Sequence, residues 1–202
     1  EIASLLADHK LTSTLLTEHC LEKRSSFLEA YKSWRPDIAL KMAALADQAF
    51  SADQKLGPLQ GIPLSIKDLY GIQDMEIYAG SPSALPEVWQ TEGPLVEQLR
   101  HQRAVFTGKT HTVEFAFGGL GVNSHWNTPR NPWDTEVHRV PGGSSSGAGI
   151  SIIEGSCLLA LGSDTAGSVR IPAAMTATVG LKTSYGRWPL AGIFPLSPTL
   201  DT

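Results

Sequence analysis

The chain has 202 residues, 42% of them hydrophobic and 18% charged, which is ordinary for a globular protein. Its net charge of −4 and the absence of any run of Lys or Arg argue against a nucleic-acid-binding surface. No apolar stretch approaches the ~20 residues of a membrane span. Two widely separated cysteines and no secretory signal pattern predict reduced thiols in a cytoplasmic protein.

Residues 1 to about 52 are predicted to be helical. Pro36-Asp37 is a typical helix start, and Ile38, Met42, Leu45 and Ala49 follow at steps of four, three and four, which places them on one helical face. Upstream, Leu11-Thr12-Ser13 offers a hydroxyl cap for a second helix. We therefore expect residues 1–55 to form a helical segment that packs on the core.

From Gly57 the pattern changes to short apolar runs separated by turns. Residues 62–67, 104–108 and 158–162 read as strands. Pro94 is placed to open one helix, and a small-residue helix is expected from 146 to 156. Strands that alternate with helices predict an α/β fold over residues 56–202, with a mixed sheet sandwiched between helices.

Two short glycine-containing patterns suggest functions that their context does not support. Gly108-Lys109-Thr110 ends like a phosphate-binding loop, but Arg103 occupies the position where that motif requires glycine. Residues 143–147 match the G-x-S-x-G nucleophile elbow, which requires an acid and then a histidine later in the chain. No histidine follows His138. Neither nucleotide binding nor an α/β-hydrolase triad is therefore favoured.

A longer run of polar and glycine residues is more specific. It comprises Pro141-Gly142-Gly143-Ser144-Ser145-Ser146-Gly147 and, later, Gly162-Ser163-Asp164-Thr165-Ala166-Gly167-Ser168-Val169-Arg170-Ile171-Pro172. Together with Gly61-Ile62-Pro63-Leu64-Ser65-Ile66-Lys67-Asp68, these blocks resemble the amidase signature family. Ser168 follows Ser144 by 24 positions, the family's spacing. Further blocks that match lie at 108–110, 114–115, 131–134 and 180–183, so the resemblance spans roughly residues 10 to 202.

The resemblance implies a Ser-Ser-Lys catalytic triad. In it Ser168 is the nucleophile, Ser144 lies on a cis peptide bond and bridges the two others, and Lys67 is the base. An amide needs a strong nucleophile, a stabilised oxyanion and a proton for the departing amine. Lys67 can act as a base only when it is neutral, so burial must lower its pKa from about 10.4. The apolar neighbours Leu64 and Ile66 are consistent with such burial, and strand alternation directs Asp68 to the other face.

The loop before Ser168 is the expected oxyanion and substrate-binding region. Thr165, Ala166 and Gly167 supply consecutive backbone N–H groups, although Ala166 stands where the family more often has glycine. By resemblance, Phe117, Gly118 and Gly119 line the acyl pocket. Asp164 and Arg170 are expected to form an ion pair that braces this loop rather than to act in catalysis. His111 and His125 are interpreted as surface or packing residues, and no His/Cys spacing indicates a metal site.

The leading functional hypothesis is an amidohydrolase that releases ammonia or an amine from a small carboxamide or urea-type amide, with no cofactor, nucleic-acid partner or membrane. A homo-oligomer is left open. The alternatives are the amidase-like subunit of a glutamine-dependent tRNA amidotransferase and a non-catalytic relative. Because the family's members are longer, we expect these residues to be the N-terminal portion of an amidase signature fold.

Overall fold

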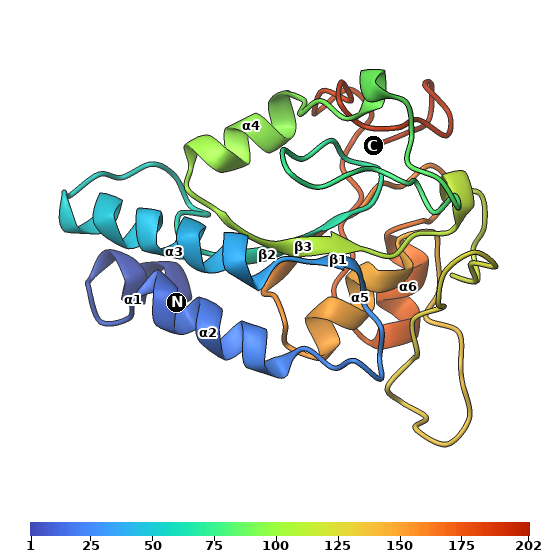
Figure 1. Cartoon of the computed structure of the whole chain (residues 1–202), viewed down its shortest axis with the longest axis horizontal. Helices are drawn as coiled ribbons and strands as arrows, with labels where there is room; N and C mark the ends of the chain where they lie inside the picture. The colour runs from blue at the N-terminus through green and yellow to red at the C-terminus, as the bar shows by residue number, and fades with distance from the viewer.

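The computed structural model describes all 202 residues and is built around a four-stranded mixed sheet of order β1-β3-β2-β4. β2 pairs in parallel with both β3 and β4, whereas β1 pairs with β3 in the antiparallel direction. The strands are β1 (Tyr31–Trp34), β2 (Pro63–Lys67), β3 (Val105–Thr110) and β4 (Leu159–Leu161). The predicted α/β class with a mixed sheet between helices is confirmed (Figure 1).

Six α-helices surround the sheet. They are α1 (Ile2–Ala7), α2 (Ser13–Lys23), α3 (Pro36–Ser51), α4 (Pro94–His101), α5 (Ser146–Ile153) and α6 (Arg170–Thr176), and two 3-10 turns, η1 (Glu87–Trp89) and η2 (Glu114–Ala116), complete the set. In Figure 1, α4 lies above the strands and α5 and α6 lie below them. The hydroxyl of Thr12 accepts a hydrogen bond from the N–H of Leu15 and so caps α2, as expected. No helix combines the length and apolar character needed to cross a membrane.

The two faces of β2 differ in chemistry because its side chains alternate. Leu64 and Ile66 join the main hydrophobic core with Phe106 of β3 and with Val96 and Leu99 of α4. On the other face, the hydroxyl of Ser65 lies 2.9 Å from that of Ser151 in α5. Lys67, two residues further on, shares the face of Ser65. The strand therefore separates an apolar layer from a polar one.

One prediction for the first 52 residues is wrong, and a second is confirmed only in part. Residues 31–34 are not helical but form β1, a short edge strand with two aromatic residues and no helical periodicity, paired with β3. On α3, Ile38 and Met42 pack against the main core and Ala49 is buried, as predicted, but Leu45 is 44% exposed. The buried residues of this helix are alanines: Ala39, Ala43, Ala46 and Ala49. Small side chains allow α3 to approach Val105 of β3 closely, and a face of large residues would hold it away.

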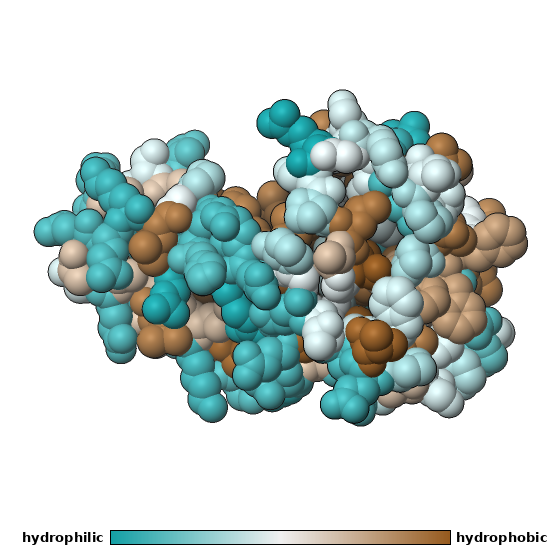
Figure 2. All heavy atoms as spheres, turned by 90° about the horizontal axis from the view of Figure 1, so that it is seen from above, coloured by the Kyte–Doolittle hydropathy of each residue, from teal (hydrophilic) through white to brown (hydrophobic).

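Figure 2 shows a mainly hydrophilic surface over the end of the molecule formed by α1–α3, and more hydrophobic surface over the opposite part. The segment after α6 contributes several exposed apolar side chains. The largest exposed fractions there are 95% for Val179, 76% for Leu181 and 61% for Tyr185.

Candidate active site

Lys67 ends β2 and is completely buried. Its amine lies 2.7 Å from the hydroxyl oxygen of Ser144 and 2.9 Å from that of Ser163. No carboxylate lies within ion-pairing distance of this amine. Burial lowers the pKa of Lys67 to about 7, although the negative charges of Asp164 and Asp201 oppose the shift. The amine is therefore neutral in a large fraction of molecules near neutral pH, and its lone pair is available to a hydroxyl proton.

Ser144 lies in a loop whose backbone is fixed on several sides. The peptide bond between Gly143 and Ser144 is cis, as expected. The N–H of Gly143 donates to the carbonyl of Gly119 at 2.8 Å, and the carbonyl of Ser144 accepts from the N–H of Val113 at 3.1 Å. A Cβ at position 143 would lie 2.9 Å from the Gly118 carbonyl oxygen, so only glycine fits there. These backbone contacts hold the Ser144 hydroxyl next to the Lys67 amine.

Ser168 lies beside this loop. Its carbonyl accepts a hydrogen bond of 3.1 Å from the N–H of Ser145, which places the backbones of the two serine-bearing loops in contact. No hydrogen bond joins the hydroxyls of Ser144 and Ser168. The Ser168 hydroxyl has no hydrogen-bond partner in the protein, and the residue is 9% exposed, so this hydroxyl can reach a bound molecule. The contact from Lys67 to Ser144 is formed, and the contact from Ser144 to Ser168 is not.

The backbone amides of the loop before Ser168 are only partly free. The N–H of Gly167 donates to Asp164 Oδ1 at 2.7 Å and is therefore already used. The N–H groups of Thr165, Ala166 and Ser168 have no acceptor in the protein. Of the three donors expected in the sequence, Thr165 and Ala166 are thus open to an anion. The N–H of Ser168 is a further open donor that sequence reasoning did not single out.

Asp164 and Arg170 form the predicted ion pair. Two bonds of 3.0 Å join the guanidinium of Arg170 to the carboxylate of Asp164, whose oxygens also accept from the N–H groups of Gly167 and Val169. Burial opposes ionisation of Asp164, but the hydrogen bonds outweigh it and lower its pKa to about 2. The buried carboxylate of Asp164 is thus bonded to the residues before and after Ser168, which is a structural role.

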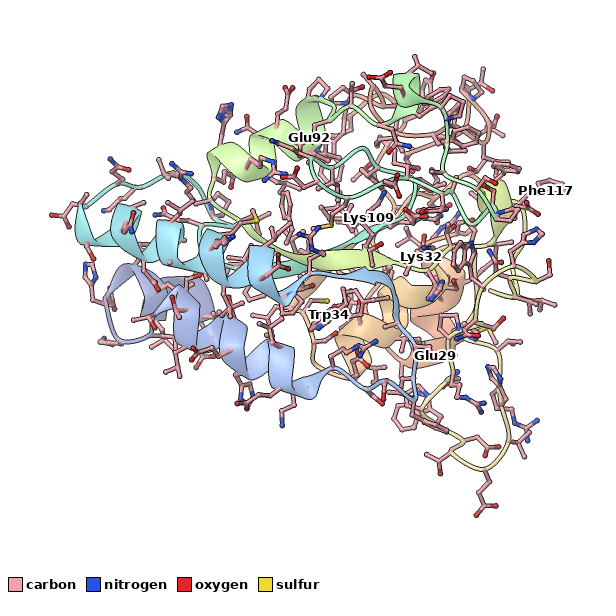
Figure 3. The ribbon with its side chains drawn as sticks, in the orientation of Figure 1. Glu29, Lys32, Trp34, Glu92, Lys109 and Phe117 are labelled. Carbon is pink, nitrogen blue, oxygen red and sulfur yellow. The ribbon has the colours of Figure 1, made fainter.

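The side chain of Phe117, which was expected to line the acyl pocket, is not covered by the residues of this chain. It is 82% exposed and lies at the outer edge of the molecule in Figure 3. The reason is local: Phe115 and Ala116 both adopt positive φ values, 48° and 59°, and this tight turn directs Phe117 outward. Gly118 and Gly119 lie near the loop that carries Ser144, because their backbones contact that of Gly143.

The two discounted glycine patterns have structural roles. Ser145, the central residue of the G-x-S-x-G match, is fully buried and cannot meet a substrate. Lys109 of the Gly-Lys-Thr match is equally buried, and its amine lies 2.7 Å from Asp68 Oδ1. As expected, Asp68 is turned away from Lys67. Lys109 lies near the centre of the view in Figure 3, and its complete burial leaves a nucleotide phosphate no access to it.

Sequence reasoning missed two polar residues of the site. Ser163 is the second hydrogen-bond partner of Lys67, and its position between Gly162 and Asp164 in the matched block was the available signal. Asp201 was also missed. Its carboxylate accepts a hydrogen bond from the hydroxyl of Thr165, 36 positions earlier in the chain. That contact joins segments too far apart for local pattern reading.

The site therefore combines a lysine that is buried without a counter-ion, a serine bonded to it and a neighbouring loop with free amides. The family model described as Amidase matches residues 16–202, and the chain belongs to this family. It is 56% identical over its whole length to 2-amino-5-chloromuconic acid deaminase of Comamonas testosteroni and covers 44% of that protein. It is 40% identical, over 86% of the chain, to a glutamyl-tRNA(Gln) amidotransferase subunit of Carboxydothermus hydrogenoformans, of which it covers 36%.

The fold agrees with this assignment. The crystal structure of peptide amidase from Stenotrophomonas maltophilia superimposes with a TM-score of 0.87 and 33% identity, over all of this chain and 43% of that one. The chain therefore spans less than half the length of the relatives it matches.

Proposed function

We propose that the protein is an amidohydrolase that uses Ser168 as nucleophile, Ser144 as proton relay and Lys67 as base. One observation carries the proposal: the Lys67 amine is wholly buried, hydrogen-bonded to Ser144 and free of any ion-pair partner. A structural lysine in such a position would normally be paired, because an unpaired buried charge is costly. A base that must be neutral to work has a reason to remain unpaired.

In the proposed reaction the Ser168 oxygen attacks the substrate carbonyl carbon. The proton of Ser168 passes to Ser144 while the proton of Ser144 passes to Lys67. The oxyanion accepts hydrogen bonds from the free N–H groups of Thr165 and Ala166. The C–N bond then breaks, and the protonated Lys67 returns a proton through Ser144 to the leaving amine. Water then attacks the acyl carbon while a proton of the water passes through Ser144 to Lys67. The bond from the acyl carbon to the Ser168 oxygen breaks, and this oxygen regains a proton from Lys67 through Ser144. The relay requires the Ser168 hydroxyl to rotate toward Ser144 when substrate binds.

The substrate that we propose is a small carboxamide or urea-type amide. The 56% identity to 2-amino-5-chloromuconic acid deaminase supports a small, nitrogen-bearing substrate that loses ammonia. The test is a panel of small amides, ureas and 2-amino-5-chloromuconic acid, with ammonia or amine release as the readout. Turnover of at least one amide or urea that is lost in Ser168→Ala supports the proposal, whereas ammonia release from 2-amino-5-chloromuconic acid alone, which has no amide bond, would indicate a deaminase instead. Turnover that persists in Ser168→Ala contradicts it.

The amidase-like subunit of a tRNA amidotransferase is a second candidate, because relatives with that description are up to 40% identical to this chain. Residues 113–117 read Val-Glu-Phe-Ala-Phe and lack the Asp-Glu-Phe-Ala-Met style associated with those relatives. A glutaminase assay with and without charged tRNA separates the two. Glutamine hydrolysis stimulated by tRNA favours the amidotransferase, and hydrolysis of small amides without tRNA favours the free enzyme.

A further inference from the structure

Residues 196–202 form a turn that grips the loop carrying Ser168. We propose that Asp201 is a positioning residue of the active site, whose carboxylate holds the Thr165 hydroxyl and thereby fixes the loop of open amides opposite Lys67. This inference rests on the proposed function. Asp201 does not touch the reacting atoms; it acts through Thr165.

The carboxylate of Asp201 is well bonded, and the residue is only 6% exposed. Besides the Thr165 hydroxyl, its oxygens accept from the N–H of Leu196 at 2.9 Å and from that of Ser197 at 2.9 and 3.1 Å. The Thr165 hydroxyl therefore donates to a carboxylate that the backbone of residues 196–202 holds in place. Because Thr165 contributes one of the open backbone N–H groups, its orientation sets the direction of that donor.

The neighbouring residues add a second attachment. The N–H of Asp164 donates to the carbonyl of Thr202 at 2.9 Å, and the hydroxyl of Thr202 donates back to the carbonyl of Asp164 at 3.0 Å. The amine of Lys182 reaches both the Asp164 carbonyl and the Thr202 hydroxyl. Two consecutive residues of the loop, 164 and 165, are thus bonded to two consecutive residues of the turn, 201 and 202.

Asp201 also bears on the charge of Lys67. The charged groups around the Lys67 amine are Asp164, which is paired with Arg170, and Asp201, which has no cationic partner. On the opposite face of the strand, Asp68 is paired with Lys109. Both Asp164 and Asp201 raise the pKa of Lys67 against the larger effect of burial. Removal of the Asp201 charge should therefore lower that pKa, an electrostatic effect that is separate from the positioning of Thr165.

Asp47 provides a matched control. Its carboxylate accepts from the N–H groups of Ser13 and Thr14 and from the hydroxyl of Thr14, a set much like that of Asp201, but it joins α3 to α2 at the far end of the molecule. Asp47→Asn should lower the melting temperature without altering the active site.

The test follows the rate at which a fluorophosphonate labels Ser168 in the full-length protein as a function of pH. We expect Asp201→Asn to slow labelling about tenfold, less than the ~10²–10³ of a lost oxyanion donor, and to move the midpoint of the pH profile to lower pH. Thr165→Val should slow labelling with little change in the midpoint, and Thr165→Ser should recover most of the rate. Asp47→Asn should leave rate and midpoint unchanged.

Two outcomes distinguish a failure of the proposed function from a failure of the inference on Asp201. If Ser168 of the wild type is not labelled, the proposed function fails and this inference falls with it. If the wild type is labelled and Asp201→Asn shows the same rate and midpoint, the inference alone is overturned. Should Asp201→Asn not fold, the comparison of Thr165→Val with Thr165→Ser decides, and equal rates in those two variants overturn the inference.

Discussion

The amine of Lys67 and the hydroxyl of Ser144 lie 2.7 Å apart in a part of the interior that offers the amine no carboxylate partner. Of the buried carboxylates nearby, Asp68 is paired with Lys109 and Asp164 with Arg170, and Asp201 accepts hydrogen bonds from N–H groups of its own turn. Because the amine is completely buried and contacts none of them, it loses its proton readily instead of remaining a fixed cation. We therefore expect the low pKa of Lys67 to affect the activity of the protein, the pH dependence of that activity and the pH dependence of stability.

Lys67→Met should abolish activity while preserving the fold. Methionine fills a similar volume and removes the base, so kcat should fall by about 10²–10⁴, the range of general base catalysis. The melting temperature should change little or rise, because no ion pair is broken. Steady-state kinetics and thermal melts at one pH measure both effects. A large loss of stability would show that the amine has a structural partner after all.

The pH dependence of activity follows from the same amine. Since Lys67 must be neutral to accept a proton, kcat/KM should rise with pH and reach half its plateau near its pKa of about 7. Initial rates at low substrate concentration across a pH series measure this. A profile with a rising limb near pH 10 would indicate an ordinary exposed lysine and contradict the assignment.

Stability should depend on pH in a defined direction. Burial lowers the pKa of Lys67 in the folded state from its ordinary value of 10.5 to about 7. Between these values the unfolded chain binds more protons than the folded one, so stability rises with pH across this window. The melting temperature of the wild type, relative to Lys67→Met, should therefore increase from about pH 7 to about pH 10. A flat difference would refute the shift.

Ser163→Ala tests the second partner of the amine. The hydroxyl oxygen of Ser163 accepts a hydrogen bond of 2.9 Å from Lys67 Nζ. Without this hydroxyl the amine should move away from Ser144, which should lower kcat about tenfold and leave KM nearly unchanged. Ser163→Thr, which keeps the hydroxyl, should restore most of the rate. Ser65→Ala is the control, because Ser65 is also a buried, hydrogen-bonded serine and lies on the same face of β2 as Lys67 but does not contact its amine. Equal effects of the two alanine variants would assign Ser163 to packing alone.

The ion pair of Asp164 and Arg170 should stabilise the nucleophile loop. Asp164→Asn weakens several charge-assisted hydrogen bonds and should cost about 2–3 kcal/mol. Because the folded pKa of Asp164, about 2, lies below its ordinary value of 3.8, its contribution is complete above about pH 4 and is lost as pH falls toward 2. Denaturant melts at pH 7 and pH 3 measure this. A variant as stable as the wild type at pH 7 would contradict the bracing role.

Local signals in the sequence were sufficient for the core strands, because the short apolar runs at 62–67 and 104–108 predicted β2 and β3. The placement of Lys67 against Ser144 was expected from the resemblance to the amidase signature family. Local signals did not predict the elements whose conformation or buried face depends on tertiary packing. Four residues at 31–34 form a strand only because β3 offers its free edge, and α3 buries alanines because the sheet lies so close to it.

The candidate site shows the same division. Lys67, Ser144 and Ser168 were predicted from the matched blocks, but Ser163 in the same block was missed. Asp201 contacts Thr165 across 36 positions, and the N–H of Gly167 donates to the neighbouring carboxylate of Asp164. Phe117 was expected to line the acyl pocket because of its loop; its side chain is exposed beyond the positive φ values at 115 and 116, and its role stays a prediction. Such outcomes depend on backbone conformation and long-range contacts, which residue patterns do not encode.

The most direct test of the Ser168 relay is the mass of the covalent intermediate formed with an amide substrate, located by peptide mapping after an acid quench. We expect one acyl group on the peptide that contains Ser168, no adduct in Ser168→Ala, and strongly slowed formation in Ser144→Ala and Lys67→Met. An acyl group on another residue, or an adduct that forms at the wild-type rate in Lys67→Met, would contradict the proposed mechanism.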